Sequence, residues 1–225
     1  MKKIGMIVAV EISAVLSRYG RPSSCSKECG FDIMKYNCKN YELIIAKSGE
    51  GELAAAAAVE HLISRHGVDM VVNFGVVGGL TPEMSKAKTC IVERVVHYQF
   101  DISEIDPVKV GQHIGYDDIY LYPDRGLFNK AIELHPELLP VTCASGDRFV
   151  GKAEDKAALN RDFGAEICEM EAAGVVLTCD RCGIPCLLIK TVSDGITGGA
   201  EEFSKEVSRS ADICLEITDQ IMAAL

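Results

Sequence analysis

The chain has 225 residues, of which 48% are hydrophobic and 25% charged, so it can bury one full core, and we expect a single domain over residues 1–225. The net charge is -10 at pH 7 and no basic stretch carries interleaved aromatic residues, which argues against a nucleic-acid surface and favours a small ligand. No run of about eighteen apolar residues is present to span a membrane.

The first half of the chain predicts buried strands, loops and one long helix. Residues 4–10 form an apolar run that Glu11 interrupts, which indicates a central strand rather than a signal peptide. The other elements predicted here are a loop at 20–30, a hairpin of 31–36 and 41–46, a helix at 52–66 and a buried strand at 68–74. Glu11 therefore stands at the carboxyl end of a strand, where ligands collect in α/β sheets.

The second half continues this alternation. It predicts strands at 88–98 and 139–144 and helices at 127–134, 156–163 and 202–224. Residues 101–124 are polar and contain three tyrosines, and a loop of this length within a compact domain is usually functional or mobile, so the segment is a candidate lid. The order of elements indicates an α/β sandwich with one composite site.

Residues 168–195 predict a helix, a turn and a strand that carry two acids at informative places. One helical face is apolar, Gly183 ends the helix, and the run 186–189 is of the buried-strand type. Glu171 lies where the helix begins, and Asp194 lies just past the carboxyl end of the strand. Spacing alone leaves a second interpretation open, in which Asp194 caps the next helix and Glu171 only complements a helix dipole.

Ten cysteines are scattered mostly through apolar runs, as small buried side chains are, and they favour a reducing cytoplasm. Two groups have spacings that metal sites use. They are Cys179 with Cys182, and Cys25 with Cys29 and the nearby Cys38. The first group has no second C-x-x-C or paired histidines to complete a metal shell, and the second is only a weak candidate, so we expect no metal.

Five turns follow one another along the chain: S-G-x-G at 48–51, G-x-x-G-G at 75–79, S-G-D-x-F at 145–149, E-M-E-A-A at 169–173 and V-S-D at 192–194. Together they resemble the purine nucleoside phosphorylase/nucleosidase superfamily, and most of all the 5'-methylthioadenosine/S-adenosylhomocysteine nucleosidases. The resemblance covers nearly the whole chain. Its specific part is E-M-E-A-A followed by S-D, because the glycine turn after the strand at 68–74 matches no phosphate-binding fingerprint.

The resemblance implies a three-layer α/β/α sandwich around a mixed, partly barrel-like central sheet. It also implies a homodimer that hydrolyses the N-glycosidic bond of purine nucleosides and releases the base, without a cofactor. Cleavage of this bond builds positive charge on the ribose and negative charge on the base. A site for it therefore needs an acid beside the base and anionic groups beside the sugar.

The resemblance also assigns roles to residues. Asp194 would donate a proton or a hydrogen bond to purine N7, and Glu171 would accept hydrogen bonds from the ribose hydroxyls. Met170 would pack on the sugar face, while Phe149 and the main chain of Val150 would hold the base. For Met170 and Phe149 a plain core position is the alternative.

Four further residues belong to the implied site, namely Glu11, Glu50, Val76 and Ser193, and three positions depart from the family pattern. Ser13 stands where the water-activating glutamate is usually found, and a serine cannot act as a base unaided, so Glu11 or Glu50 would have to orient the water. Val76 occupies a position that is usually serine. Glu50 would place a buried carboxylate against the 5' substituent, which favours a polar 5'-hydroxyl over a thioether.

Two other functions stay open. E-M-E-A-A-G and T-V-S-D-G also resemble purine nucleoside phosphorylases, whose phosphate site needs converging arginines. Neither the Ser13 region nor Asn73 and Phe74, where that branch keeps its arginines, supplies one, so hydrolysis is favoured. The missing glutamate also allows a nucleoside-binding protein that has lost catalysis.

Overall fold

The computed structural model describes residues 1–225 as ten strands, six α-helices and one π-helix. The strands are β1 (Lys2–Val8), β2 (Ser24–Glu28), β3 (Phe31–Asn37), β4 (Tyr41–Lys47), β5 (Met70–Gly79), β6 (Thr89–His97), β7 (Tyr120–Leu121), β8 (Leu139–Ser145), β9 (Ile167–Glu169) and β10 (Cys186–Asp194). The helices are α1 (Ile12–Tyr19), α2 (Glu52–His61), the π-helix η1 (Leu62–His66), α3 (Arg125–Leu134), α4 (Ala153–Phe163), α5 (Ala172–Cys182) and α6 (Ala200–Ala224).

All ten strands form one mixed sheet, in the order β10-β6-β8-β9-β5-β1-β4-β3-β2, with β7 paired to β6. An additional pairing of β10 with β5 closes β10, β6, β8, β9 and β5 into a barrel. Asn73 of β5 is in parallel register with Ile7 of β1 on one side and Leu188 of β10 on the other. The carboxyl ends of these three strands therefore meet at one edge of the sheet.

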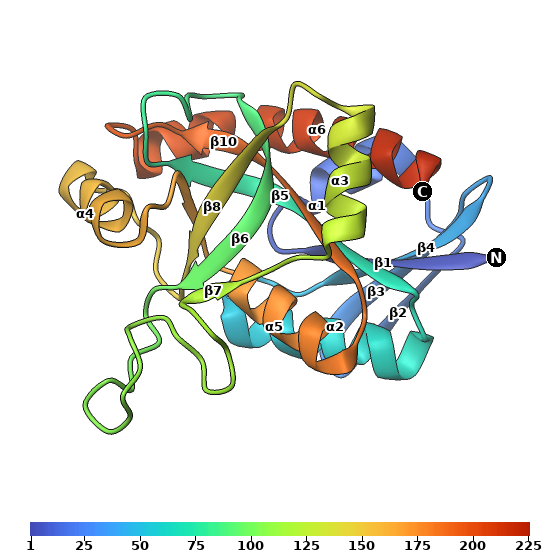
Figure 1. The fold of residues 1–225 in the computed structure, drawn as a ribbon. Coiled ribbons are helices and arrows are strands. Elements are labelled where there is room, and N and C mark those ends of the chain that lie inside the picture. Colours follow the sequence, from blue (N-terminus) through green and yellow to red (C-terminus); the bar gives the residue numbers. More distant parts are fainter.

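Helices cover both faces of the sheet, with α1, α3 and α6 on one face and α2 and α5 on the other (Figure 1). The predicted three-layer sandwich with a partly barrel-like sheet is confirmed. Each face has its own apolar cluster, one of 27 and one of 24 buried residues. Full burial of an aliphatic side chain stabilises a fold by about 1.5–3 kcal/mol, so these two clusters fix the layers.

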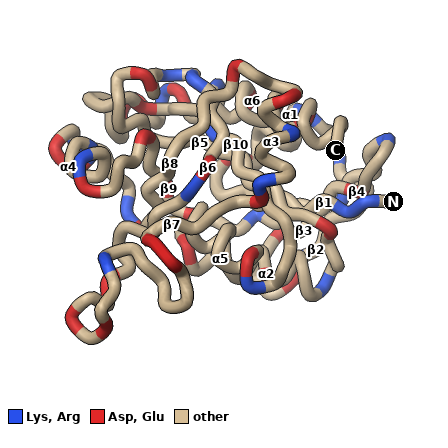
Figure 2. The backbone as a smooth tube through the Cα atoms, in the orientation of Figure 1, with Lys and Arg blue, Asp and Glu red and all other residues tan.

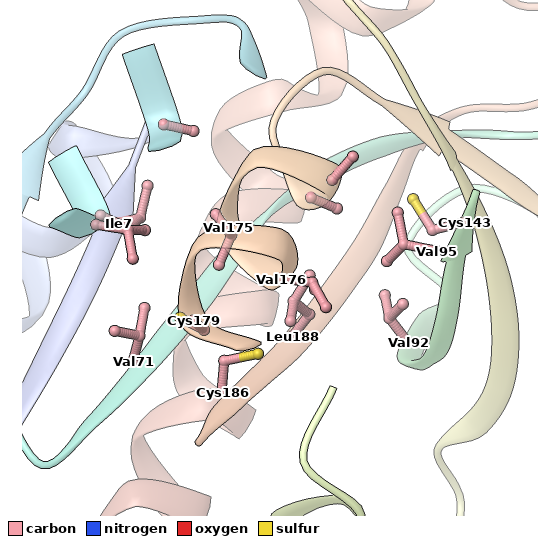
Figure 3. Close-up of a cluster of buried hydrophobic side chains, with 14 of the residues drawn as sticks. Ile7, Val71, Val92, Val95, Cys143, Val175, Val176, Cys179, Cys186 and Leu188 are labelled. Carbon is pink, nitrogen blue, oxygen red and sulfur yellow. The ribbon is translucent and has the colours of Figure 1, made fainter. Parts of the chain in front are cut away.

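Helix α5 shows how the apolar face predicted within 168–195 is used. Val175, Val176 and Cys179 point from α5 into the space between β1 and β5 on one side and β6 and β8 on the other (Figure 3). Gly183 follows the helix with a φ of 66°, a left-handed conformation that glycine adopts without strain. The predicted helix, stop and strand are confirmed, and the strand runs on to Asp194.

Two predicted loops are wrong because they contain strands. Strand β2 lies within the predicted loop 20–30 and pairs antiparallel with β3; its side chains are mostly exposed, so it has no apolar pattern to detect. The glycines at 75–79 belong to β5 and form no turn. A Cβ added at Gly79 would lie 2.0 Å from the Met84 carbonyl oxygen, so the glycines let neighbouring groups approach the strand.

Residues 101–119 project from the body of the molecule between β6 and β7 (Figure 1). At the base of this segment Phe100 stacks on His113, with ring centroids 4.1 Å apart. None of residues 101–124 lines the main cavity at the strand ends, so the segment does not act as a lid over it in this arrangement.

Charged residues are spread over the whole backbone, with Lys and Arg interspersed among Asp and Glu (Figure 2). The basic residues therefore form no stripe of the kind that binds nucleic acid, which agrees with the acidic net charge. No helix combines the length and the apolar character that crossing a bilayer requires.

Candidate active site

A cavity of about 420 Å³ opens where β1, β5 and β10 end. It brings together residues that are far apart in the sequence. Eight of the nine predicted site residues line it, namely Glu11, Glu50, Val76, Phe149, Met170, Glu171, Ser193 and Asp194. The ninth, Val150, is buried and lines a smaller adjoining cavity of about 30 Å³, together with Phe149, Met170 and Asp194.

Asp194 is the last residue of β10 and is only 1% exposed. Its Oδ2 lies 2.6 Å from Nζ of Lys156, a fully buried lysine of α4, and its Oδ1 accepts a hydrogen bond of 2.9 Å from the Ser193 hydroxyl. Lys156 also donates to the Gly195 carbonyl oxygen at 2.7 Å. The next helix begins only at Ala200, so the interpretation of Asp194 as a helix cap is wrong.

A second buried ion pair lies beside the cavity. Lys190 of β10 approaches Glu169 at 3.2 Å, and Glu169 also accepts hydrogen bonds from the Ser145 hydroxyl at 2.6 Å and the Ala172 amide at 2.9 Å. Burial alone would raise the pKa of Glu169, but the Lys190 ammonium and these donors lower it. Glu52, whose carboxyl group contacts the same Ser145 hydroxyl, has its pKa raised to about 8, first by burial and then by the charge of Glu169.

Glu171 precedes α5, and its carboxylate reaches across to another element. Its Oε1 accepts a hydrogen bond of 3.0 Å from the Gly51 amide. Gly51 has a φ of 103°, which favours glycine, so the S-G-x-G turn can direct this amide at the carboxylate. Burial, and then the nearby Glu169 carboxylate, raise the pKa of Glu171 to about 8. Burial in the free protein therefore favours the protonated form of Glu171.

Glu11 is held by two main-chain amides at the cavity wall. Val10 donates to Oε2 and Val76 donates to Oε1, both at 3.0 Å. A Cβ at Gly75 would lie 2.8 Å from Oε1, so the glycine is what admits this carboxylate to the strand. Ser13 is exposed on α1 and does not line the cavity, which leaves Glu11 as the acid of this segment that faces a ligand.

The rest of the cavity supplies an aromatic end and a charged rim. Phe149 is 45% exposed and contacts Phe203 edge-on with centroids 5.5 Å apart, and Met170 is half-buried, so the plain core alternative is wrong for both Phe149 and Met170. Glu50 is exposed at the rim, so the expectation that its carboxylate is buried against a ligand is also wrong.

Comparison with known proteins agrees with this geometry. The profile of the phosphorylase superfamily matches residues 4–225. The chain belongs to the phosphorylase superfamily. It is 30% identical to the aminodeoxyfutalosine nucleosidase of Campylobacter jejuni over 183 residues, which cover 78% of each chain. It is 32% identical to the 5'-methylthioadenosine/S-adenosylhomocysteine nucleosidase of Hydrogenovibrio crunogenus over 171 residues, 73% of each chain.

Comparison with solved structures points to the same family. A crystal structure of the Helicobacter pylori 5'-methylthioadenosine/S-adenosylhomocysteine nucleosidase, in complex with a substituted pyrrolidin-3-ol, superposes with a TM-score of 0.93 at 26% identity. The superposition covers 100% of this chain and 99% of the Helicobacter chain. The resemblance seen in the sequence is therefore confirmed.

Sequence reasoning missed four buried charged residues, of which Glu169 lines the cavity and the other three lie behind it: Glu52, Lys156 and Lys190. Lys190 carried a signal, because a lysine inside an otherwise apolar strand needs a buried anion. Glu169 could have been noticed because it is the first glutamate of the E-M-E-A-A motif. Lys156 gave no signal in the sequence, because α4 is polar along most of its length and only the fold shows that its one lysine points inward.

Proposed function

We propose that the protein is an N-ribohydrolase that cleaves the N-glycosidic bond of adenosine-like purine nucleosides and releases the base. One observation carries the proposal: the cavity is lined by five acidic residues and by no lysine or arginine. Such a surface stabilises a ribose that becomes cationic, and it offers no free cation to bind a phosphate dianion, because the two lysines behind it already pair with Asp194 and Glu169. The relatives named above are nucleosidases, which supports the same reaction.

In this proposal the base and the sugar occupy opposite ends of the cavity. Phe149 stacks on the base, and Asp194 faces purine N7, to which a proton is donated. Lys156 and Ser193 position the two carboxylate oxygens of Asp194, and the proton that N7 gains passes through the Lys156–Asp194 pair. Departure of the base is thereby coupled to a proton that is already held inside the protein.

At the other end, Glu171 accepts from the ribose hydroxyls and Met170 packs on the sugar face. The attacking water is oriented by Glu11, whose two oxygens are fixed by main-chain amides. The bond between the anomeric carbon and the base nitrogen breaks, a bond from that carbon to the water oxygen forms, and the proton that the water loses passes to the Glu11 carboxylate. Because ribose charge develops next to carboxylates, the transition state is favoured over the ground state.

The test compares adenosine, inosine and 5'-methylthioadenosine, each with and without phosphate. Hydrolysis predicts base release at a rate independent of phosphate, with free ribose or its 5'-thio analogue as the second product. A rate that rises with phosphate and yields a sugar 1-phosphate would establish the phosphorylase alternative. Binding without turnover of any of the three would establish the binding-protein alternative.

The same experiment measures the preference of the site for the group at the 5' position of the substrate. Glu50 is exposed to water at the cavity rim. Placing a thioether beside it should therefore cost less free energy than placing one beside a buried carboxylate. We expect adenosine to be preferred over 5'-methylthioadenosine by no more than about 10-fold in kcat/KM. Glu50→Gln should remove this preference, and an unchanged ratio in that variant would show that Glu50 does not face the substrate.

We further propose that residues 1–225 act as one domain in a cytoplasmic homodimer. All ten cysteines are unpaired, which suits a reducing compartment. Three large apolar side chains are strongly exposed, Leu53 at 83%, Ile105 at 81% and Ile114 at 66%, and a subunit contact would cover them. Sedimentation equilibrium at micromolar concentration should give twice 24.3 kDa, whereas a mass of 24.3 kDa would rule the dimer out.

A further inference from the structure

Glu28, His61 and His66 form a cluster outside the cavity. Glu28 ends the edge strand β2, His61 ends α2 and His66 ends η1. None of the three lines the cavity, and the proposed reaction uses none of them. The histidine side chains are only 10% and 7% exposed, whereas that of Glu28 is 27% exposed, so the cluster is enclosed on the histidine side and open to solvent beside the carboxylate.

The three side chains converge on one point. Nε2 of His61 lies 3.0 Å and Nε2 of His66 lies 3.1 Å from the same oxygen of Glu28, and all three ligand atoms fall within 4.8 Å of one another. In a tetrahedral zinc site with bonds of about 2.0–2.1 Å, neighbouring ligand atoms are about 3.3 Å apart. The two carboxylate–imidazole distances are therefore already within a few tenths of an ångström of that spacing, and the two imidazole nitrogens lie no more than 4.8 Å apart, so a modest closure around an ion would give three corners of such a site.

The convergence depends on a local departure from α-helical geometry. His61 and His66 are five residues apart, a spacing that a regular α-helix of 3.6 residues per turn would place on well-separated directions. The π-helical turn Leu62–His66 brings residues five apart onto one side, and Gly67 ends it with a φ of 62°. Single π-helical turns are uncommon and often occur at functional sites.

We propose that Glu28, His61 and His66 bind one Zn²⁺ ion, with water at the fourth position. Imidazole nitrogens with one carboxylate suit a borderline cation such as Zn²⁺ better than Ca²⁺ or Mg²⁺, which prefer all-oxygen sites. The ion would tie the β2–β3 hairpin to the end of α2, the helix whose first residue, Glu52, contacts the active site. None of the cysteines considered as metal ligands from the sequence belongs to this group.

The experiment uses the chelator-treated full-length protein titrated with Zn²⁺ by calorimetry, and with Co²⁺ to follow tetrahedral d–d absorption. Wild type should bind one ion per chain. His66→Gln should lose affinity by more than about 100-fold, because even partners outside the ligand shell contribute 10–100-fold. Glu28→Gln should weaken binding as well.

Two control variants test whether the ion binds at these three residues and at no other histidine or cysteine pair. His135→Gln removes a histidine that also pairs with a single glutamate, Glu137 at 2.9 Å, and it should bind Zn²⁺ as wild type does. A Cys25→Ser and Cys29→Ser double variant should do the same. The proposal would be overturned by unchanged Zn²⁺ affinity in His66→Gln, by loss of binding in the cysteine variant, or by no binding in the wild type. The cluster would then be only two imidazoles hydrogen-bonded to one carboxylate.

Discussion

Asp194→Asn is expected to lower kcat for nucleoside hydrolysis by about 10²–10⁴-fold while KM stays close to that of the wild type. The asparagine keeps the shape and the bond from Ser193, but it cannot deliver a proton to the departing base. Steady-state kinetics on the best nucleoside of the substrate comparison measures this. Turnover at the wild-type rate would show that Asp194 is not the acid.

The same substitution is also expected to destabilise the fold, because it leaves the Lys156 ammonium buried without its anion. Removing one partner of a buried ion pair typically costs about 3–5 kcal/mol. In a protein of this size such a loss lowers Tm by roughly 6–20 °C. The matched control is the double variant Asp194→Asn with Lys156→Met, which should recover most of the Tm and none of the activity.

The single variant Lys156→Met distinguishes the role of Lys156 from that of Asp194. It leaves a buried Asp194 without a cation, and burial then favours the protonated acid. In the wild type the proton comes from the Lys156–Asp194 pair, whereas in the variant only the Asp194 carboxyl can carry it, so the pH above which activity falls should differ from that of the wild type. A pH profile identical to that of the wild type would show that Lys156 plays no part in the proton transfer and only fills the core.

Much of the site could be predicted from the sequence because its acids stand at the ends of strands and helices. The positions of Glu11 and Asp194 follow from apolar runs that stop at a known residue, and parallel pairing then brings those ends together. The proximity of Glu171 to Gly51 follows from no local pattern, since it depends on how α5 and α2 pack.

What could not be predicted is which charges are buried and how deeply. Glu50 was expected in an apolar wall but lies on the rim, because the turn that carries it faces solvent. Lys156 belongs to a helix that reads as polar, yet it is fully buried, since Leu159 of α4 packs in an apolar cluster with residues of β6, β8 and β9. Strand β2 and the π-helical turn escaped detection because neither has an apolar period.

Glu171→Gln is the second substitution with a large expected effect. Glutamine still accepts the bond from the Gly51 amide, so the free protein should fold normally. In the reaction, however, a carboxylate beside the ribose gains strength as the sugar becomes cationic, and a neutral amide does not. A charge-assisted hydrogen bond contributes about 1.5–3 kcal/mol, so kcat/KM should fall by about 10–100-fold, with a lower kcat and a higher KM.

The pH dependence distinguishes this role from a structural one. Because the pKa of Glu171 is raised to about 8, the ionised fraction in the free protein grows as the pH rises from 6 to 8. Wild-type kcat/KM should rise over this range, and the profile of Glu171→Gln should be flatter. Stability should change in the opposite sense, because a raised folded-state pKa makes the folded protein hold the proton longer than the unfolded chain does.

Wild-type Tm should therefore fall as the pH rises from about 5 to 8, and Glu171→Gln should lose less Tm over the same range. Glu52 is the matched control, since burial raises its pKa to about 8 as well, but it does not line the cavity. Glu52→Gln should reduce the fall in Tm and leave the rise in kcat/KM in place. If Glu171→Gln kept the wild-type rise in kcat/KM, the ionisable group that serves the ribose would have to be another carboxylate of the cavity, with Glu11 the next to test.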